Sequence, residues 1–152
     1  MKKQYFQGFF KPKNYEKYKG NPTNIKYKSS WELKYLMQLD KDPDVLSYSY
    51  ETIIVPYLSP IDGKKHRYYV DFIVTKQLPN GKTQTSLIEI KPLKQTQPPK
   101  KRAKITKAYI NEINTWGVNE AKWKYAQEFC KDRGWKFEIY TEQTLNIPTW
   151  KK

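Results

Sequence analysis

The stretch YVDFIVTKQLPNGKTQTSLIEIKP, residues 69–92, decides the fold of this chain. Two runs rich in β-branched residues flank the turn triplet Pro79-Asn80-Gly81, which is the pattern of a β-hairpin. Proline at the second turn position, and glycine where a left-handed residue is needed, predict a three-residue loop that pairs Leu78 with Lys82. A two-residue Asn-Gly loop is the alternative, and it would shift the pairing of the strands by one residue.

The three-residue loop has a consequence for two acidic residues. Counting back along an uninterrupted ladder places Asp71 directly opposite Glu89, and the period of two puts both on one face with Lys91. The alternative loop would place Asp71 opposite Ile90, on the other face. Carboxylates directly opposite each other repel, and burying unpaired charge costs several kcal/mol per group. The register therefore predicts a cation between Asp71 and Glu89.

The composition is that of a single, folded and strongly basic domain. The 152 residues carry 29 Lys and Arg against 15 Asp and Glu, a net charge of +14, and 16% are aromatic. This charge favours a polyanionic partner, most commonly nucleic acid, and the aromatic content excludes a disordered basic tail. One cysteine excludes an internal disulfide and suits a reducing cytoplasm. Since we find no signal peptide and no apolar run of membrane length, we expect a soluble protein.

The basic residues are concentrated in two segments. Residues 1–31 hold eight lysines and one acid, and residues 92–111 hold six basic residues and no acid. Because the second segment follows directly after Lys91, it predicts a phosphate track leading to the carboxylates. The alternative is a solvated loop and helix face.

The order of the elements follows from local signals. We expect an irregular, aromatic and basic arm over residues 1–27, packed on one domain that spans residues 28–152. Within that domain the predicted helices and strands are a helix at 29–40, strands at 48–57, 67–77 and 85–91, helices at 101–116 and 120–133, and a strand at 135–141. Gly117 and Gly134 are the expected helix stops, and Asn119 the expected cap of the second of these late helices.

Glu32 has two interpretations. With Ser29 it forms a capping-box pattern, which stabilises a helix start without any catalytic role. Leu36 and Leu39, however, follow it by four and seven residues, so Glu32 lies on the stripe that faces the core. A carboxylate there can reach a metal ion held by the hairpin.

The ordered set of these acids resembles the PD-(D/E)xK nuclease superfamily. Val70-Asp71 stands where that family has Pro-Asp, and Glu89-x-Lys91 supplies the second half of the pattern. The segments SWEL (30–33), HRYYVDF (66–72), IEIKP (88–92) and FEIYTE (137–142) are more closely similar to the TnsA-type transposon endonuclease domain. QGFFKPKN (7–14), with residues 24–32, resembles the small head-completion nucleases of large tailed phages. The ExK triplet alone is a common chance match, whereas the ordered set is far more specific.

The resemblance implies a fold and a site. The fold is α/β with a restriction-endonuclease-like core, a central mixed β-sheet flanked by helices in the order α-β-β-β-α-α-β. The implied activity is that of an Mg²⁺-dependent endodeoxyribonuclease, with Mn²⁺ as a substitute, since oxygen ligands suit hard cations rather than zinc. The implied catalytic residues are Glu32, Asp71, Glu89 and Lys91. The metal ligands are Asp71, Glu89 and the Ile90 backbone carbonyl, with Glu32 at the same or a second ion, while Lys91 orients the attacking water.

Further residues are candidates for contact with the DNA backbone. They are basic or amide side chains that precede the Asp71 strand or follow Lys91: His66, Arg67, Lys94, Gln95, Lys100, Lys101, Arg102, Lys104 and Lys107. For His66 and Arg67 a structural or surface role is the alternative. For Lys91 the alternative is a surface ion pair with Glu89.

We therefore expect an enzyme that trims or processes DNA during phage head completion or packaging, in the host cytoplasm or with the virion. DNA is the expected partner, and phage head or portal proteins are further candidates. One alternative is a non-catalytic head-completion protein that grips DNA, and another is a TnsA-like transposase or repair nuclease subunit. The sequence leaves open the DNA preference, the number of metal ions, the oligomeric state and any need for a partner.

Overall fold

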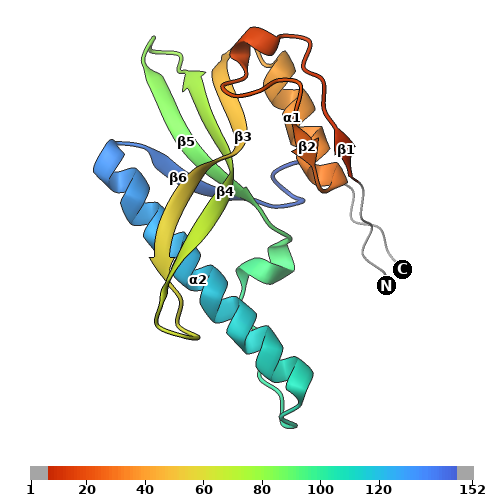
Figure 1. The fold of residues 1–152 in the computed structure, drawn as a ribbon, viewed down its shortest axis with the longest axis vertical. Coiled ribbons are helices and arrows are strands. Elements are labelled where there is room, and N and C mark those ends of the chain that lie inside the picture. The colour runs from red at the N-terminus through yellow and green to blue at the C-terminus, as the bar shows by residue number, and fades with distance from the viewer. Residues whose placement is uncertain (1–6, 147–152) are drawn as a thin grey trace.

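The computed structural model of the chain describes residues 7–146 (Figure 1). A four-stranded sheet of order β3-β4-β5-β6 has helix α1 on one side and helix α2 on the other. The first three of these strands are antiparallel neighbours, and β6 pairs parallel to β5, so the sheet is mixed. The elements are β1 (Gly8–Phe9), η1 (Tyr15–Lys17), β2 (Lys26–Tyr27), α1 (Ser30–Lys41), β3 (Val45–Leu58), β4 (Lys65–Gln77), β5 (Thr83–Ile90), η2 (Leu93–Thr96), α2 (Lys107–Arg133) and β6 (Lys136–Tyr140). The expected class, a mixed sheet flanked by helices, is confirmed.

The hairpin between β4 and β5 has the predicted three-residue loop. The Leu78 amide donates to the Lys82 carbonyl at 2.7 Å, and the Gly81 amide donates to the Leu78 carbonyl at 2.9 Å. Gly81 has φ of 84°, the left-handed conformation that favours glycine. The ladder then runs in uninterrupted register to Phe72 opposite Ile88, so the predicted register is correct and the two-residue alternative is not.

Strand β3 carries a β-bulge at a position that matters for the site. Tyr50 pairs with Phe72 and Ile53 pairs with Val70, so Glu51 and Thr52 together oppose the single residue Asp71. Glu51 has φ of 56°, which is unusual for a residue other than glycine. Bulges bend a strand, increase its twist and re-aim side chains, and they are common beside active sites.

Two clusters of buried side chains lie on the two sides of the sheet. On the α1 side, Leu36 packs with Phe72 and Ile88. On the α2 side, Leu87 packs with Trp123. Ala126 and Cys130 of α2 are fully buried in the same cluster. The sheet is thus held from both sides at the end of the β4–β5 ladder, where Phe72 pairs with Ile88.

Helix α1 begins at the predicted cap. The Ser29 hydroxyl accepts a hydrogen bond from the Glu32 amide at 3.2 Å, which satisfies one free amide of the first turn. The Glu32 carboxylate accepts from the Lys28 amide, one residue further back than in the usual capping box. The helix therefore starts where the sequence predicted it, and the cap fixes the Glu32 side chain.

The amino-terminal segment contributes to the core. Residues 1–6 of the expected arm lie outside the described part of the chain. From residue 7 on, β1 and β2 form a small antiparallel sheet beside α1 (Figure 1). Phe10 and Ile25 are buried in the cluster on the α1 side. Within residues 7–146, no helix is both long and apolar enough to span a membrane.

The late helical region differs from the prediction. Two helices at 101–116 and 120–133 were expected, and one helix, α2, runs from Lys107 to Arg133. Thr106 is its actual cap, because its hydroxyl accepts from the Tyr109 amide at 3.1 Å. Gly117 lies inside the helix, so a mid-helix glycine is tolerated here and Asn119 caps nothing. Gly134 ends the helix as predicted, with φ of 71°.

Substituting Gly117 with alanine is expected to stabilise the protein. An added Cβ would meet Pro60 Cγ at 3.7 Å, an ordinary van der Waals contact. Alanine is favoured over glycine in a helix interior by about 0.8–1 kcal/mol. Urea unfolding followed by circular dichroism should show an increase of roughly that size. A decrease would mean that the helix is interrupted near residue 117.

Candidate active site

Asp71 and Glu89 meet at the end of the β4–β5 ladder. The paired residues of the two strands end at Phe72 opposite Ile88, and Asp71 and Glu89 are the next residue on each strand, close enough for the charge of Glu89 to act on Asp71. Here an Asp71 side-chain oxygen, Oδ2, accepts the Ile90 amide at 2.8 Å. The carboxylate of Asp71 is therefore fixed against the backbone of the strand that carries Glu89.

The surroundings of the two carboxyl groups disfavour their charged forms. Burial raises the pKa of Asp71 well above its ordinary range, and the charge of Glu89 raises it further. Burial also raises the pKa of Glu89, whose side chain is 9% exposed, against the opposing effect of its hydrogen bond from Tyr68. Carboxylates in such surroundings favour a proton or a cation. This is the charge conflict that the hairpin register predicted.

Glu89 is held between a tyrosine and a lysine. The Tyr68 hydroxyl donates to Glu89 Oε1 at 2.6 Å, and Lys91 Nζ lies 3.5 Å from Glu89 Oε2. The backbone of Lys91 is itself anchored, because its amide donates to the Tyr140 carbonyl on β6 at 2.9 Å. The ion pair that was the alternative interpretation of Lys91 thus forms. It also places the lysine beside the carboxylates, as a catalytic role requires.

Glu32 approaches the hairpin carboxylates from the start of α1. Its Oε1 accepts from the Lys28 amide at 2.7 Å and from the Tyr50 hydroxyl at 3.0 Å. Its charge contributes to raising the pKa of Asp71, as a smaller effect than burial and Glu89. Lys28, four residues earlier, pairs with the bulge residue Glu51 at 3.0 Å. The capping role of Glu32 is therefore present, and its carboxylate faces the same region as Asp71.

The donor set is small and made of oxygen. Within residues 7–146, no three His, Cys, Asp or Glu side chains gather closely enough to form a metal cluster by themselves. Asp71 and Glu89 are the adjacent pair, and Glu32 stands further off with one oxygen already engaged. Two desolvated carboxylates with raised pKa values fit a hard divalent cation. A site of this kind leaves most of the ion's coordination to water or substrate.

The basic segment after β5 forms a groove against α2. The groove has a volume of about 700 Å³, and four of the predicted DNA-contacting residues line it: Lys94, Gln95, Lys100 and Arg102. The Arg102 guanidinium pairs with Glu112 at 3.1 Å. The other three predicted residues of this segment, Lys101, Lys104 and Lys107, are exposed and do not line the groove. Lys104 was expected on a helix and lies instead in the loop before it, because α2 begins at Lys107.

His66 and Arg67 lie away from the carboxylates. Both are exposed near the start of β4, and His66 is five residues, or about 16 Å of extended strand, from Asp71. The His66 Nε2 is 2.8 Å from Asp62 Oδ2 in the β3–β4 turn. This contact with Asp62 supports the alternative interpretation of His66, a structural or surface role.

Two residues near the site were not singled out by the sequence. Tyr68 lies within a segment that carried the family resemblance, but a tyrosine in a strand gives no sign that it bonds a carboxylate. Lys122 of α2 lies over the Tyr68 ring, and Glu89, Lys91 and Asp71 all influence its pKa. A signal existed for Lys122, because it precedes Ala126 and Cys130 at the four-residue spacing of a buried helical stripe.

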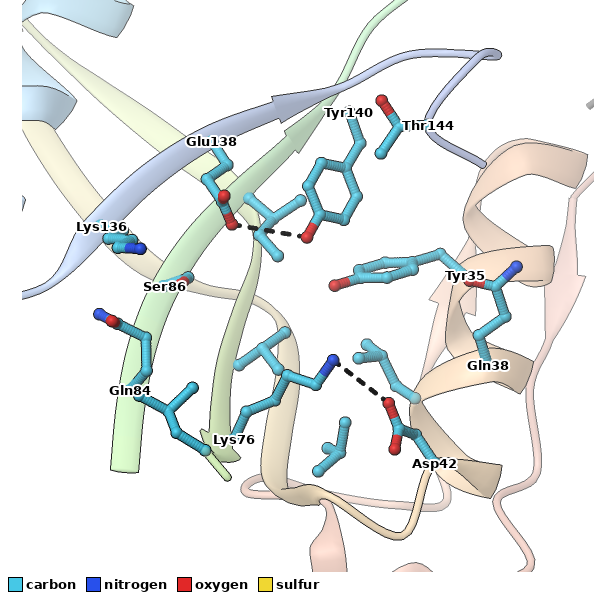
Figure 2. A pocket seen from close by; sticks show the side chains of 15 residues that line it. Tyr35, Gln38, Asp42, Lys76, Gln84, Ser86, Lys136, Glu138, Tyr140 and Thr144 are labelled. Carbon is cyan, nitrogen blue, oxygen red and sulfur yellow. Dashed lines mark hydrogen bonds and ion pairs between the residues drawn. The ribbon is translucent and has the colours of Figure 1, made fainter. Parts of the chain in front are cut away.

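A second cavity lies between α1 and the opposite face of the sheet. Figure 2 shows it with Tyr35 and Gln38 on the helix side; a Lys76–Asp42 ion pair of 3.3 Å and a hydrogen bond from Tyr140 to Glu138 also line it. Its volume is about 420 Å³. None of the predicted site residues lines it, so this cavity is not the candidate active site.

Comparison with known proteins agrees with these features. Residues 42–142 match the family model described as TnsA-like endonuclease N terminal. The chain is also 43% identical over 144 residues to the head completion nuclease of Enterobacteria phage T4, which covers 92% of this chain and 93% of that protein. Both resemblances drawn from the sequence are thereby confirmed. The mixed sheet between two helices is consistent with a restriction-endonuclease-like core.

Proposed function

We propose that this chain, which belongs to the family of TnsA-like endonucleases, hydrolyses phosphodiester bonds of DNA at the Asp71–Glu89 pair. The observation that carries the proposal is that two desolvated carboxylates act on each other just beyond the last pair of the β4–β5 ladder, with Lys91 Nζ 3.5 Å from Glu89. Stability alone does not explain this arrangement, because buried like charges are destabilising. A net charge of +14 supports a polyanionic substrate.

Mg²⁺ is the cofactor that we assign to this pair, with Mn²⁺ as a substitute. Asp71, Glu89 and the Ile90 carbonyl would hold the ion, and Glu32 would contact it or an ordered water. When bound, the ion supplies charge stabilisation at the phosphate and lowers the pKa of a water. Zinc is a poorer fit to an all-oxygen set.

The protein groups around the pair have separate roles in this proposal. Lys91, fixed by Glu89 and by the β6 backbone, orients the attacking water and counters charge that develops on the phosphate. Tyr68 holds the Glu89 carboxylate in one orientation. The groove lined by Lys94, Gln95, Lys100 and Arg102, whose first residue follows Lys91 by three positions in the sequence, binds the DNA backbone.

The proposed setting is the completion of phage heads, where the enzyme trims or processes packaged DNA. This setting is supported by the similarity to the T4 protein, which extends over nearly the full length of both chains. DNA is the substrate in this proposal, and head or portal proteins are candidate partners at the site of assembly.

Purified protein is expected to convert supercoiled plasmid to nicked and linear forms in Mg²⁺ or Mn²⁺ and to be inactive in EDTA. Adding back Mg²⁺ after EDTA should restore cleavage, because the ion neutralises the carboxylate pair. Gel electrophoresis of the plasmid over time gives the rate. Binding of plasmid without cleavage under all metal conditions would favour the non-catalytic, DNA-gripping alternative. Cleavage only in the presence of a second protein would favour a partner-dependent nuclease subunit.

A further inference from the structure

Lys122 lies on the side of α2 that packs against the sheet. It precedes the buried Ala126 by four residues. Its Nζ lies 5.5 Å from the centroid of the Tyr68 ring and 5.8 Å from that of Tyr57. The Tyr68 hydroxyl in turn donates to Glu89 at 2.6 Å. Tyr68 of β4 therefore contacts both a carboxylate of the candidate active site and a lysine of α2, the helix that covers this side of the sheet.

The ammonium group of Lys122 has no acidic partner of its own. Among the described residues, no carboxylate lies within ion-pair distance of it, and Glu89 pairs with Lys91 instead. Burial lowers the pKa of Lys122, Glu89 and Asp71 counteract this, and Lys91 adds to it. Aromatic faces attract a cation without engaging its three N–H donors as a carboxylate does. The lysine is thus held in place with its donors available to an anion.

We propose that Lys122 binds a non-bridging oxygen of the phosphate that is cleaved, as a second lysine beside Lys91. This inference rests on the proposed function. A phosphate at the Asp71–Glu89 pair meets two carboxylates, and fixed cations around it reduce that repulsion. An ammonium in a partly desolvated site acts more strongly on developing charge than one in water. Lys122 supplies this charge from the α2 side of the site.

Lys122→Met is the direct test, and Lys124→Met is its matched control. Lys124 is an exposed lysine two residues along the same helix, so both variants remove one charge from α2. At saturating DNA, Lys122→Met should lower kcat by about 10²-fold, the scale of losing one stabilising donor. Lys124→Met should cleave as the wild type does. Lys122→Arg, which keeps the charge, should restore much of the lost rate.

The salt dependence of DNA binding separates a phosphate contact from a purely structural role. In an Asp71→Asn background, which is not expected to cleave, binding is measured in Mg²⁺ at several salt concentrations. Adding Lys122→Met should reduce the slope of log K against log salt by about one, and adding Lys124→Met should leave the slope unchanged. The melting temperature of Lys122→Met should equal or exceed that of the wild type, because the lysine is half-buried without an ion-pair partner.

The outcomes distinguish this inference from the proposed function. Absence of nuclease activity in the wild type defeats the proposed function. If the wild type cleaves and Lys122→Met cleaves equally fast, the inference about Lys122 is overturned and the proposed function stands. A slower Lys122→Met with an unchanged salt slope also overturns the phosphate contact. If methionine prevents folding, Lys122→Gln, which keeps a polar end, takes its place with the same expected results.

Discussion

Replacing Asp71 or Glu89 with alanine is expected to lower DNA cleavage by at least about 10³-fold. Each carboxylate would contribute to holding the divalent ion, whose stabilisation of the transition state amounts to several kcal/mol, and about 4 kcal/mol corresponds to 10³ in rate. DNA binding should remain largely intact, because it depends on the basic residues of the groove after β5. Plasmid nicking measures the first effect, and an electrophoretic mobility shift in EDTA measures the second.

The matched control for Glu89→Ala is Glu138→Ala on the neighbouring strand. Glu138 is an acid of the same sheet that lines the cavity on the α1 side, so its substitution removes the same charge outside the candidate site (Figure 2). Glu138→Ala should cleave at the wild-type rate. Cleavage unchanged in both Asp71→Ala and Glu89→Ala would defeat the nuclease assignment at this pair. Loss of binding together with cleavage would indicate instead that the acids maintain the fold.

The hairpin that carries the site could be predicted because its signals are local. Pro79 and Gly81 specify one loop, the loop fixes the register, and the register leads to Asp71 and Glu89 as the next residues beyond the last pair, Phe72 and Ile88. The start of α1 was predictable for the same reason, since Ser29 and Glu32 are close in sequence and bond each other. Sequence reasoning succeeds where the residues that decide a feature are neighbours along the chain.

The parts that could not be predicted depend on contacts between distant segments. Gly117 reads as a helix stop, yet the helix continues through it because its flanking residues Trp116 and Val118 pack against the sheet. The bulge at Glu51 has no local turn signal, and its position opposite Asp71 follows only from the pairing of β3 with β4. Lys122 lies 33 residues beyond Glu89, and only the packing of α2 on the sheet brings the two together. The only signal in the sequence for Lys122 was its four-residue spacing from Ala126 and Cys130, which places it on a buried helical stripe.

Mg²⁺ is expected to stabilise the wild-type fold and not the variants Asp71→Asn and Glu89→Gln. An ion that binds the folded state alone raises the free energy of unfolding by about 2.7 kcal/mol at a concentration 100 times its Kd. Without metal, the amide variants should instead be more stable than the wild type by about 0.5–2 kcal/mol, because each removes one of two opposed, desolvated charges. Thermal or urea unfolding, with Mg²⁺ and with EDTA, measures both effects without reference to cleavage.

The pH dependence has a sign that follows from the raised pKa values. In the folded protein Asp71 and Glu89 hold their protons to higher pH than in the unfolded chain, where the carboxyl pKa is about 4. Above that pH the folded state binds more protons than the unfolded state, so metal-free stability falls as pH rises toward the raised pKa values. The difference in stability between the wild type and each amide variant should therefore widen over this range in EDTA and be small below pH of about 4. A difference that stays constant with pH, or that Mg²⁺ leaves unchanged, would mean that the two carboxylates are already compensated within the protein and that no cation is needed between them.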